Sequence, residues 1–344
     1  MNQVVVSIIS YSLCSGSLVL INKLILHHFH FPSLVSTFQF IAAVAFIYAA
    51  KHSGKLQVDE LEMKYIIPYL YYIVAFALGI YCNMQSLSRS NVETVIVFRA
   101  LSPCLVAVLD ALFLGRQWPS VQSWVSIAGI ALGAYGYALH DTKFQEQGIA
   151  AYFWPMCYLL LITFEMAYGK RIISGVDLKT KSGPVLYTNL LGIPPMLGFA
   201  ILAGEPGRFL RQEDHGFSVV SILLLLVGCV VGTGIGYSSW WCRDQVSATS
   251  FTLIGVLNKV LTVTVNACIW DQHANTTGIL CLLVSLVCGT LYRQAPLRTA
   301  AQEEATTIVA ANADVWEMEE DEQVLRHRTR SFDAEEQEPL TKRA

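Results

Sequence analysis

The chain of 344 residues is 54 % hydrophobic and only 14 % charged, and its mean hydropathy is +0.47. So apolar a composition excludes a soluble protein of this length and predicts a polytopic α-helical membrane protein. The formal net charge of −3 gives no basic surface for nucleic acid, so we expect no nucleic-acid partner. All nine cysteines fall within or beside apolar runs, which favours small buried thiols over a disulfide framework.

Apolar stretches of near-spanning length recur along the chain as far as residue 291. They cover residues 4–26, 33–50, 66–87, 92–114, 121–139, 149–167, 185–203, 217–240, 246–269 and 277–291. We therefore expect ten transmembrane helices. Eight or nine is the alternative count, because some stretches fall short of the ~20 residues that a perpendicular span requires. The first stretch lacks a basic lead and is expected to be a retained span.

The fourth helix of each half of this arrangement carries a cation, Arg99 in the first half and Lys259 in the second. Halves with an odd number of helices insert in opposite orientations, which gives the inverted repeat of many secondary transporters. We expect an all-α polytopic membrane protein of two inverted five-helix repeats, residues 1–145 and 146–293. A disordered acidic cytosolic tail, residues 294–344, is expected to follow them.

Basic residues in the connecting loops predict the orientation of the chain. If the amino terminus is cytosolic, the cytosolic loops carry Lys51, Lys55, Lys64, Arg116, Lys170, Arg171, Lys179, Lys181, Arg243, Arg293 and Arg298. The opposite side then carries only Arg89, Lys143, Arg208 and Arg211. Both termini are therefore expected in the cytosol. Gly129 and Gly133, four residues apart, favour close helix packing in the fifth stretch.

Lys259 ends the sequence Gly-Val-Leu-Asn-Lys in the middle of the ninth stretch. A charged side chain at the centre of a spanning helix costs roughly 2.5–3.5 kcal/mol on insertion scales. The lysine stem reaches only about 6 Å, against a hydrocarbon half-thickness of about 15 Å, so snorkelling gives little relief. Lys259 is expected to face a wet cavity or an anionic solute. The alternative is an ion pair with a buried carboxylate.

Further polar residues lie inside the apolar stretches. They are Tyr11, Asn22, Lys23, Arg99, Tyr187, Thr188, Asn189, Thr252 and Asn258. Two cations with amides and hydroxyls suit a solute that carries phosphates beside a base or a sugar, although any one amide or hydroxyl can also tie helices together. The chain has no zinc, nucleophile-elbow or phosphate-loop motif, so we expect neither an enzyme nor a bound cofactor or metal.

The stretch Gly255 to Lys259 also resembles the ninth-helix motif Gly-Ala-Leu-Asn-Lys of the Golgi nucleotide-sugar transporters of the GDP-mannose type, in the drug/metabolite transporter superfamily. It departs from that motif only at Val256. Residues 186–189, Leu-Tyr-Thr-Asn, match part of the seventh-helix motif Phe-Tyr-Asn-Asn. Residues 94–99 look most like those of plant members.

This resemblance implies a substrate-binding set. Its members are Tyr11, Arg99, Tyr187, Thr188, Asn189, Gly255, Asn258 and Lys259. The seventh-helix residues would lie at the nucleobase, the ninth-helix residues toward ribose, phosphates and sugar, and Tyr11 near the sugar. Thr188 replaces the first motif asparagine and so bears on base recognition.

The function expected from the resemblance is antiport: a GDP-sugar of the GDP-mannose class enters the Golgi lumen in exchange for GMP. The expected partners are the nucleotide sugar, the nucleoside monophosphate and membrane lipid, with a homodimer as a further candidate. One alternative is a transporter of the same fold for a UDP-sugar or a phosphorylated metabolite. Another is a membrane receptor or retention factor that transports nothing.

Overall fold

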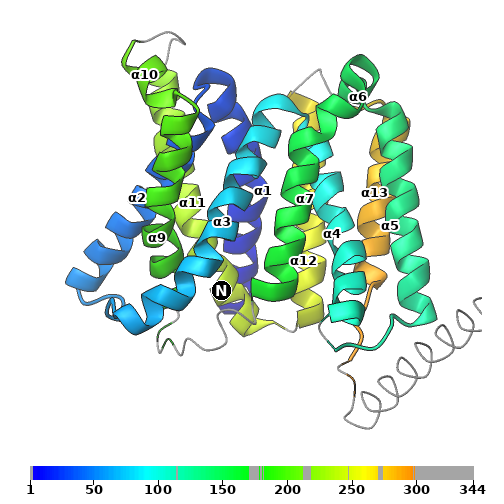
Figure 1. Ribbon diagram of the computed structural model, residues 1–344, viewed down its shortest axis with the longest axis horizontal. Helices are drawn as coiled ribbons and strands as arrows, with labels where there is room; N and C mark the ends of the chain where they lie inside the picture. Colours follow the sequence, from blue (N-terminus) through cyan, green and yellow to red (C-terminus); the bar gives the residue numbers. More distant parts are fainter. Residues whose placement is uncertain are drawn as a thin grey trace, which may run out of the picture.

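A computed structural model describes residues 3–113, 115–169, 178, 180, 182–211, 218–246, 248–269, 274–296 and 298. Every element in this part of the chain is helical, and the long helices stand side by side (Figure 1). In chain order the elements are α1 (Gln3–His28), α2 (Pro32–His52), α3 (Met63–Arg89), α4 (Val92–Phe113), α5 (Val121–His140), α6 (Thr142–Gln147), the 3₁₀ turn η1 (Gly148–Tyr152), α7 (Phe153–Phe164), the π turn η2 (Glu165–Gly169), α9 (Gly183–Leu202), α10 (Glu205–Leu210), α11 (Val219–Gln245), α12 (Ala248–Ile269) and α13 (Thr276–Leu291).

Each predicted apolar stretch lies on a helix, and the sixth is composite. It was expected as one helix over residues 149–167, but η1, α7 and η2 share it after the short α6. Gly148 ends α6 with a φ of 62°, in the left-handed region that glycine adopts without strain. The chain therefore changes helical geometry twice within one apolar run.

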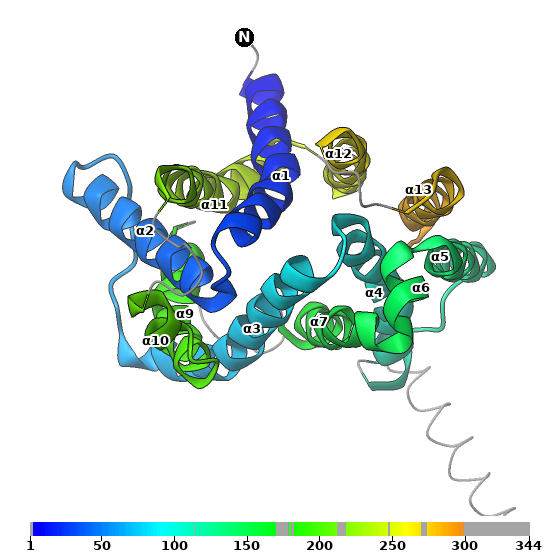
Figure 2. The same ribbon diagram turned by 90° about the horizontal axis from the view of Figure 1, so that it is seen from above.

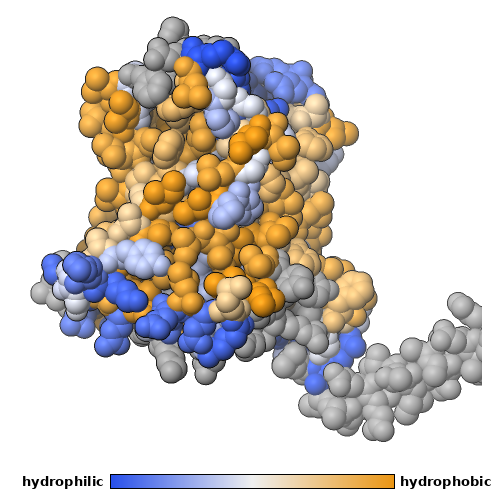
Figure 3. Space-filling model, turned by 60° about the vertical axis from the view of Figure 1, so that its left-hand side comes forward, coloured by the Kyte–Doolittle hydropathy of each residue, from blue (hydrophilic) through white to orange (hydrophobic). Residues whose placement is uncertain are grey.

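Six helical segments in the described part of the chain are long and apolar enough to cross a membrane. They are Gln3–His28, Pro32–His52, Val92–Phe113, Thr142–Ala167, Gly183–Leu202 and Val219–Ser239. The face in Figure 3 has an apolar band between two polar ends, as a bilayer requires. The protein is a polytopic helical membrane protein.

The closest helix packing joins α5 and α13. A Cβ atom on Gly133 would lie 2.7 Å from the carbonyl oxygen of Cys281 and 2.9 Å from the backbone nitrogen of Ser285. The Ser285 hydroxyl donates a hydrogen bond to the carbonyl of Ile130 at 2.6 Å. Small residues thus let the two backbones approach within contact distance, as the glycine spacing predicted.

A carboxylate from the second half of the chain caps the start of α2. Glu205, at the start of α10, is buried and accepts hydrogen bonds from Ser33 N at 3.2 Å, Ser33 Oγ at 2.9 Å and Leu34 N at 2.9 Å. Phe31, the N-cap residue of α2, provides no side-chain cap. Glu205 therefore accepts hydrogen bonds from two free N–H groups at the start of α2. Its negative charge also interacts favourably with the positive end of the helix dipole. Burial raises the pKa of Glu205 above its ordinary value, against the effect of these hydrogen bonds.

An acid from the first half holds the start of α9 less directly, through Thr180, whose hydroxyl oxygen accepts a hydrogen bond from Gly183 N at 3.1 Å. Asp59, in the linker between α2 and α3, accepts hydrogen bonds from the backbone nitrogen of Thr180, at 2.9 Å, and from its hydroxyl. Ser182, the N-cap residue of α9, provides no side-chain cap. Because α2 and α9 also pack together, each helix of the pair is tied at its start by an acid that follows the other helix.

The main hydrophobic core lies at the end of the bundle where α1 ends and α2 and α4 begin. Ile25, Val35 and Val92 are buried there. A smaller cluster, around Tyr69 and Tyr187, joins α3 to α9. The first end is therefore the more tightly packed by apolar side chains.

The first residues of the predicted tail pack against the connection between α4 and α5. Arg116 donates to the carbonyl of Ala295 at 2.8 Å, and the backbone nitrogen of Gln117 donates to the carbonyl of Pro296 at 3.0 Å. Arg298 donates to the carbonyl of Ala111 at 2.8 Å. These non-helical residues therefore pack against the helical bundle, while residues 299–344 lie outside the described part of the chain.

The contact between α5 and α13 predicts unequal effects of two alanine substitutions. Gly133→Ala should lower the free energy of unfolding by about 1–3 kcal/mol, because the new methyl group meets backbone atoms. Gly198→Ala, in α9, has nothing within 4 Å of the new methyl group and should be neutral or stabilising by up to about 1 kcal/mol. Thermal unfolding of the purified variants measures both, and equal melting temperatures would contradict the close packing.

Candidate functional site

Lys259 and Arg99 lie near each other in the interior of the bundle. Lys259 is close to the middle of α12, Arg99 is two turns into α4, and their positive charges repel each other. Among the described residues, no carboxylate lies within ion-pair distance of either cation. In this part of the chain, the alternative of a carboxylate partner for Lys259 therefore finds no support.

The Arg99 side chain faces an accessible space within the bundle. It is exposed, although Phe98 and Ala100 beside it in the chain are buried. Its guanidinium is in hydrogen-bonding contact with Tyr158 on α7 and interacts electrostatically with Tyr11 on α1. α1 and α12 lie on one side of this region, and α4 and α7 lie on the other (Figure 2). Arg99 interacts with helices on both sides of this region. Its exposed surface therefore faces the interior of the bundle, where water or a solute can reach it.

Tyr11 completes the group from the side of α1. Its ring stacks on Phe251 of α12, with centroids 4.9 Å apart and planes inclined by 22°. A Cβ atom on Gly255 would lie 3.9 Å from the Tyr11 hydroxyl, so the absence of a side chain there leaves room beside that hydroxyl. Tyr11, Arg99, Tyr158 and Lys259 form a set that we call the cation cluster.

Asn258 does not share the exposure of its neighbour Lys259. It is buried, and its Nδ2 atom has no hydrogen-bond partner within the described ranges. Thr262, one turn on, donates to the carbonyl of Gly16 at 3.0 Å, which places this face of α12 against α1. The expected contact of Asn258 with ribose or phosphate stays a prediction.

The three predicted residues of α9 form a separate group. The Tyr187 hydroxyl donates to the carbonyl of Glu60 at 2.7 Å and accepts from the backbone nitrogen of Glu62 at 3.1 Å, and its ring is fully buried. Thr188 donates to the carbonyl of Pro184, and Asn189 donates to the carbonyl of Val185, both at 2.7 Å. Tyr187 thus holds the linker between α2 and α3, and the other two side chains bond to their own helix.

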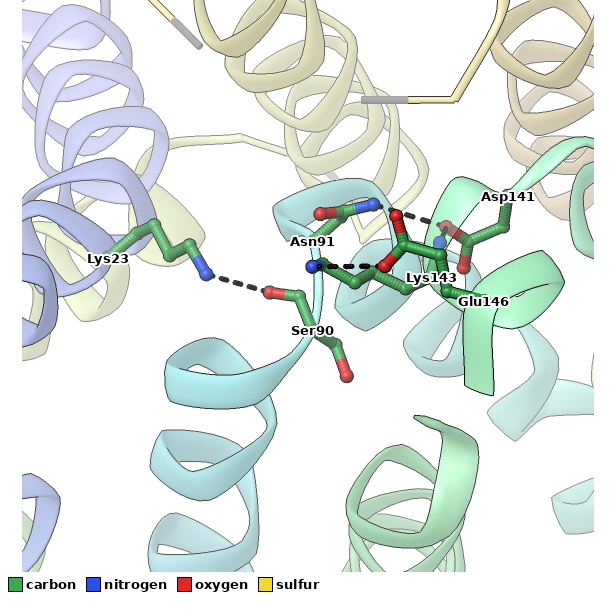
Figure 4. A network of polar contacts seen from close by, with 6 residues as sticks. All are labelled: Lys23, Ser90, Asn91, Asp141, Lys143 and Glu146. Carbon is green, nitrogen blue, oxygen red and sulfur yellow. Dashed lines mark hydrogen bonds and ion pairs between the residues drawn. The ribbon is translucent and has the colours of Figure 1, made fainter. Parts of the chain in front are cut away.

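A polar network lies at the end of the bundle where α1 ends (Figure 4). Lys23 donates to the carbonyls of Leu87, at 2.6 Å, and Ser90, at 2.8 Å. Asn91 donates to Asp141 at 3.1 Å, which connects the start of α4 to the end of α5. Lys23 therefore ties α1 to the C-terminus of α3, where a cation is favoured by the helix dipole.

A second contact at this end joins α12 to α4. Asn266 donates to Glu93 at 2.7 Å, and both side chains are buried. Glu93 precedes Arg99 by six residues and Asn266 follows Lys259 by seven, so the contact lies about 10 Å beyond the cations along each helix. Lys23 and Asn266 together hold α1 and α12 against α3 and α4, and they close the bundle beyond the cation cluster.

A large apolar cavity lies elsewhere, between α2, α9 and α11. Its volume is about 1050 Å³, and its lining includes Phe46, Val185, Val230 and Tyr237. Lys55 is the one charged residue in its described lining, whereas the cation cluster brings two cations together and is therefore the stronger candidate for phosphate binding. Asn189 lies one turn beyond Val185, on the same face of α9.

The structure adds residues that the sequence did not single out as binding candidates. Tyr158 was one tyrosine among many, and its contact with Arg99 depends on how α7 packs against α4. Asn266 lies in an apolar run, and the sequence does not distinguish it from the other amides inside such runs. Polarity within an apolar stretch could have flagged it, but it would not have identified Glu93 as its partner.

This molecule is thus a helical membrane protein with a pair of cations inside the bundle, an arrangement that often marks a substrate or ion pathway in membrane proteins. The model of the Triose-phosphate Transporter family matches residues 3–293, and the chain belongs to that family. It is 36 % identical to GDP-fucose transporter 1 of Arabidopsis thaliana over 291 residues, 83 % of this chain and 84 % of the relative.

Two further relatives cover most of the chain. GDP-mannose transporter GONST3 of Arabidopsis thaliana is 32 % identical over 84 % of this chain and 77 % of its own length. UDP-galactose/UDP-glucose transporter 7 of the same plant is 26 % identical over 85 % of this chain and 90 % of its own length. The family thus includes proteins named for guanine and for uracil nucleotide sugars.

Lys259→Ala should weaken the binding of nucleoside phosphates while leaving the protein folded. Losing one contact to a charged group corresponds to about 1.5–3 kcal/mol, or roughly a 10- to 150-fold increase in Kd for GMP or UMP. Removing a partly buried cation that has no carboxylate partner among the described residues should not lower the melting temperature. Isothermal titration of the purified variant measures the Kd, with Lys64→Ala at the exposed start of α3 as a control that should change neither quantity. An unchanged Kd for both nucleotides would exclude Lys259 from the site.

Proposed function

We propose that this protein is a nucleotide-sugar antiporter of the Golgi membrane that imports a GDP-sugar into the lumen in exchange for GMP. The observation that carries the proposal is the pair of cations, Lys259 and Arg99, that meet within the bundle with no carboxylate of the described residues at ion-pair distance. A pyrophosphate between the two cations would satisfy both. The relatives named for GDP-fucose and GDP-mannose support guanine as the base.

The packing of the helices supports two inverted repeats of five spans each. If α1 to α5 correspond to α7, α9, α11, α12 and α13, the contact of α1 with α11 is repeated as that of α7 with α3. The contact of α1 with α12 is repeated as that of α7 with α4, and the contact of α2 with α11 as that of α9 with α3. The pairs α2 with α9 and α5 with α13 map onto themselves. The contact of Glu205 with the start of α2 and that of Asp59 with Thr180, before α9, are exchanged by the same correspondence.

The loop charges favour cytosolic termini, as in the sequence prediction. With that orientation, the end closed by Lys23 and Asn266 is the lumenal end. Opening toward the lumen would then require Lys23 to leave the α3 carbonyls and Asn266 to leave Glu93. The structure would correspond to a carrier closed to the lumen.

The coupling of the two fluxes follows from the charges. A carrier that reorients while empty must carry Lys259 and Arg99 through a closed state without a bound anionic solute, at a cost of a few kcal/mol. A bound nucleotide removes most of that cost. Return with GMP is therefore faster than return without it, and exchange needs no ATP.

A UDP-sugar is the second candidate substrate. The relative named for UDP-galactose and UDP-glucose favours it, as does Thr188 in place of the motif asparagine. An amide offers a base both a donor and an acceptor in fixed positions, whereas a hydroxyl bonded to its own helix offers less discrimination. Competition between GMP and UMP for uptake of the labelled sugar nucleotide distinguishes the two substrates.

Proteoliposomes test the antiport directly. Vesicles preloaded with GMP should take up labelled GDP-sugar at least about tenfold faster than empty vesicles, since roughly 1.4 kcal/mol of barrier corresponds to a factor of ten. Arg99→Gln should lower this ratio, because the empty variant carries one charge fewer through the closed state. A wild-type ratio near one would exclude the antiport, and acceleration by UMP but not by GMP would favour the UDP-sugar.

A further inference from the structure

A carboxylate stands beside the cation cluster without pairing to it. Glu165, half-buried, is the first residue of the π turn η2, which packs against both α3 and α4. Its charge interacts with Arg99 and with Tyr158, but it forms no ion pair within 4 Å of Arg99. Single π turns often occur at functional sites.

Tyr72 of α3 holds this carboxylate. The Tyr72 hydroxyl donates to Glu165 Oε1 at 2.7 Å. Tyr72 also stacks on Phe76, with centroids 5.8 Å apart, so its ring is fixed by packing as well as by the hydrogen bond. Glu165 is therefore anchored to α3, on the same side of the bundle as Arg99 and within its electrostatic reach.

The other intramembrane acids of the described residues have partners of their own. Glu93 accepts a hydrogen bond from Asn266, and Asp141 accepts from Asn91, Thr94 and Tyr152. Asp110 lies 3.4 Å from Arg116 at the other end of α4. Glu165 is thus the acid placed to respond to a change in the charge at Arg99.

We propose that Glu165 is the internal counter-anion of Arg99 and competes with the substrate phosphates for it. The proposal rests on the antiport proposed above and assigns the residue that tunes it. In the empty carrier, the carboxylate partly neutralises the guanidinium. A phosphate group that binds Arg99 must displace this interaction, and Tyr72 keeps the carboxylate on α3 and limits how well it competes.

The competing explanation is structural: Glu165 only joins η2 to α3 through Tyr72. The two explanations predict different signs. If Glu165 competes for Arg99, removing its charge strengthens nucleotide binding, whereas releasing it from Tyr72 weakens binding. If Glu165 only holds the helices together, removing its charge leaves the contact with Tyr72 in place and binding unchanged or weaker, and only the loss of the Tyr72 hydroxyl loosens the contact.

Two substitutions separate these outcomes. Glu165→Gln removes the charge and keeps an oxygen that can accept from Tyr72. Tyr72→Phe removes the hydrogen bond and keeps both the charge and the ring packing. We expect Glu165→Gln to lower the Kd for GMP by about fivefold or more and Tyr72→Phe to raise it, in line with the usual range of coupling between sites. The double variant should behave like Glu165→Gln.

The transport assay supplies a second readout. Glu165→Gln should raise the ratio of uptake by GMP-preloaded vesicles to uptake by empty ones, because the empty carrier loses its counter-anion. Glu146→Gln removes a carboxylate from the exposed surface of α6 and should leave both the Kd and the ratio unchanged. It controls for the loss of one negative charge anywhere in the protein.

The measurements use GMP, UMP and inorganic phosphate as probes of the purified full-length protein. Changes of the same sign in the two single variants, or an unchanged or weaker affinity in Glu165→Gln, would overturn the role of Glu165. Binding of none of the three anions by the wild type would instead overturn the proposed function. If UMP binds and GMP does not, the assignment of guanine as the base fails. The Kd values of Glu165→Gln and Tyr72→Phe are then compared with UMP as the ligand.

Discussion

The repulsion between Lys259 and Arg99 is the constraint on which the structure depends. Two like charges inside an apolar bundle are stable only where water or an anion reaches them, because burying an unpaired charge costs several kcal/mol. The exposure of Arg99 among buried neighbours meets this requirement. A helical bundle that must keep such a space open cannot pack uniformly along its length. The polar contacts of Lys23 and Asn266 close one end, and the cations lie about two turns further in.

The rest of the fold separates fixed contacts from contacts that can change. α5 and α13 meet backbone to backbone at Gly133, and the acids Glu205 and Asp59 tie α2 and α9 together at their starts. The contacts beside the site are of another kind. Asn266 joins the two helices that bear the cations, and Lys23 joins α1 to the end of α3, in both cases through hydrogen bonds that can break and reform. A carrier needs both kinds, because a rigid support lets a small local change move whole helices.

The sequence by itself determined the membrane class and the positions of the helices, and it predicted a functional role for Lys259. These follow from local rules: a spanning helix needs a long apolar run, and a central lysine is too costly to lack a partner or a function. The glycine spacing in α5 also predicted the close approach to a neighbour. In the sixth stretch, hydropathy predicted one helix, but the chain forms a 3₁₀ turn, an α-helix and a π turn, since all three can bury the same apolar residues.

Only the tertiary structure decided which polar side chains face the cations. Tyr187 and Asn258 belong to motifs, yet one bonds to a linker and the other is buried beside a partly exposed lysine. Tyr158 and Glu165 belong to no motif and lie beside Arg99. The physical reason is that hydropathy and motif spacing fix the helix on which a residue lies. Its partner is set by how distant helices pack against one another, and this is a property of the whole bundle.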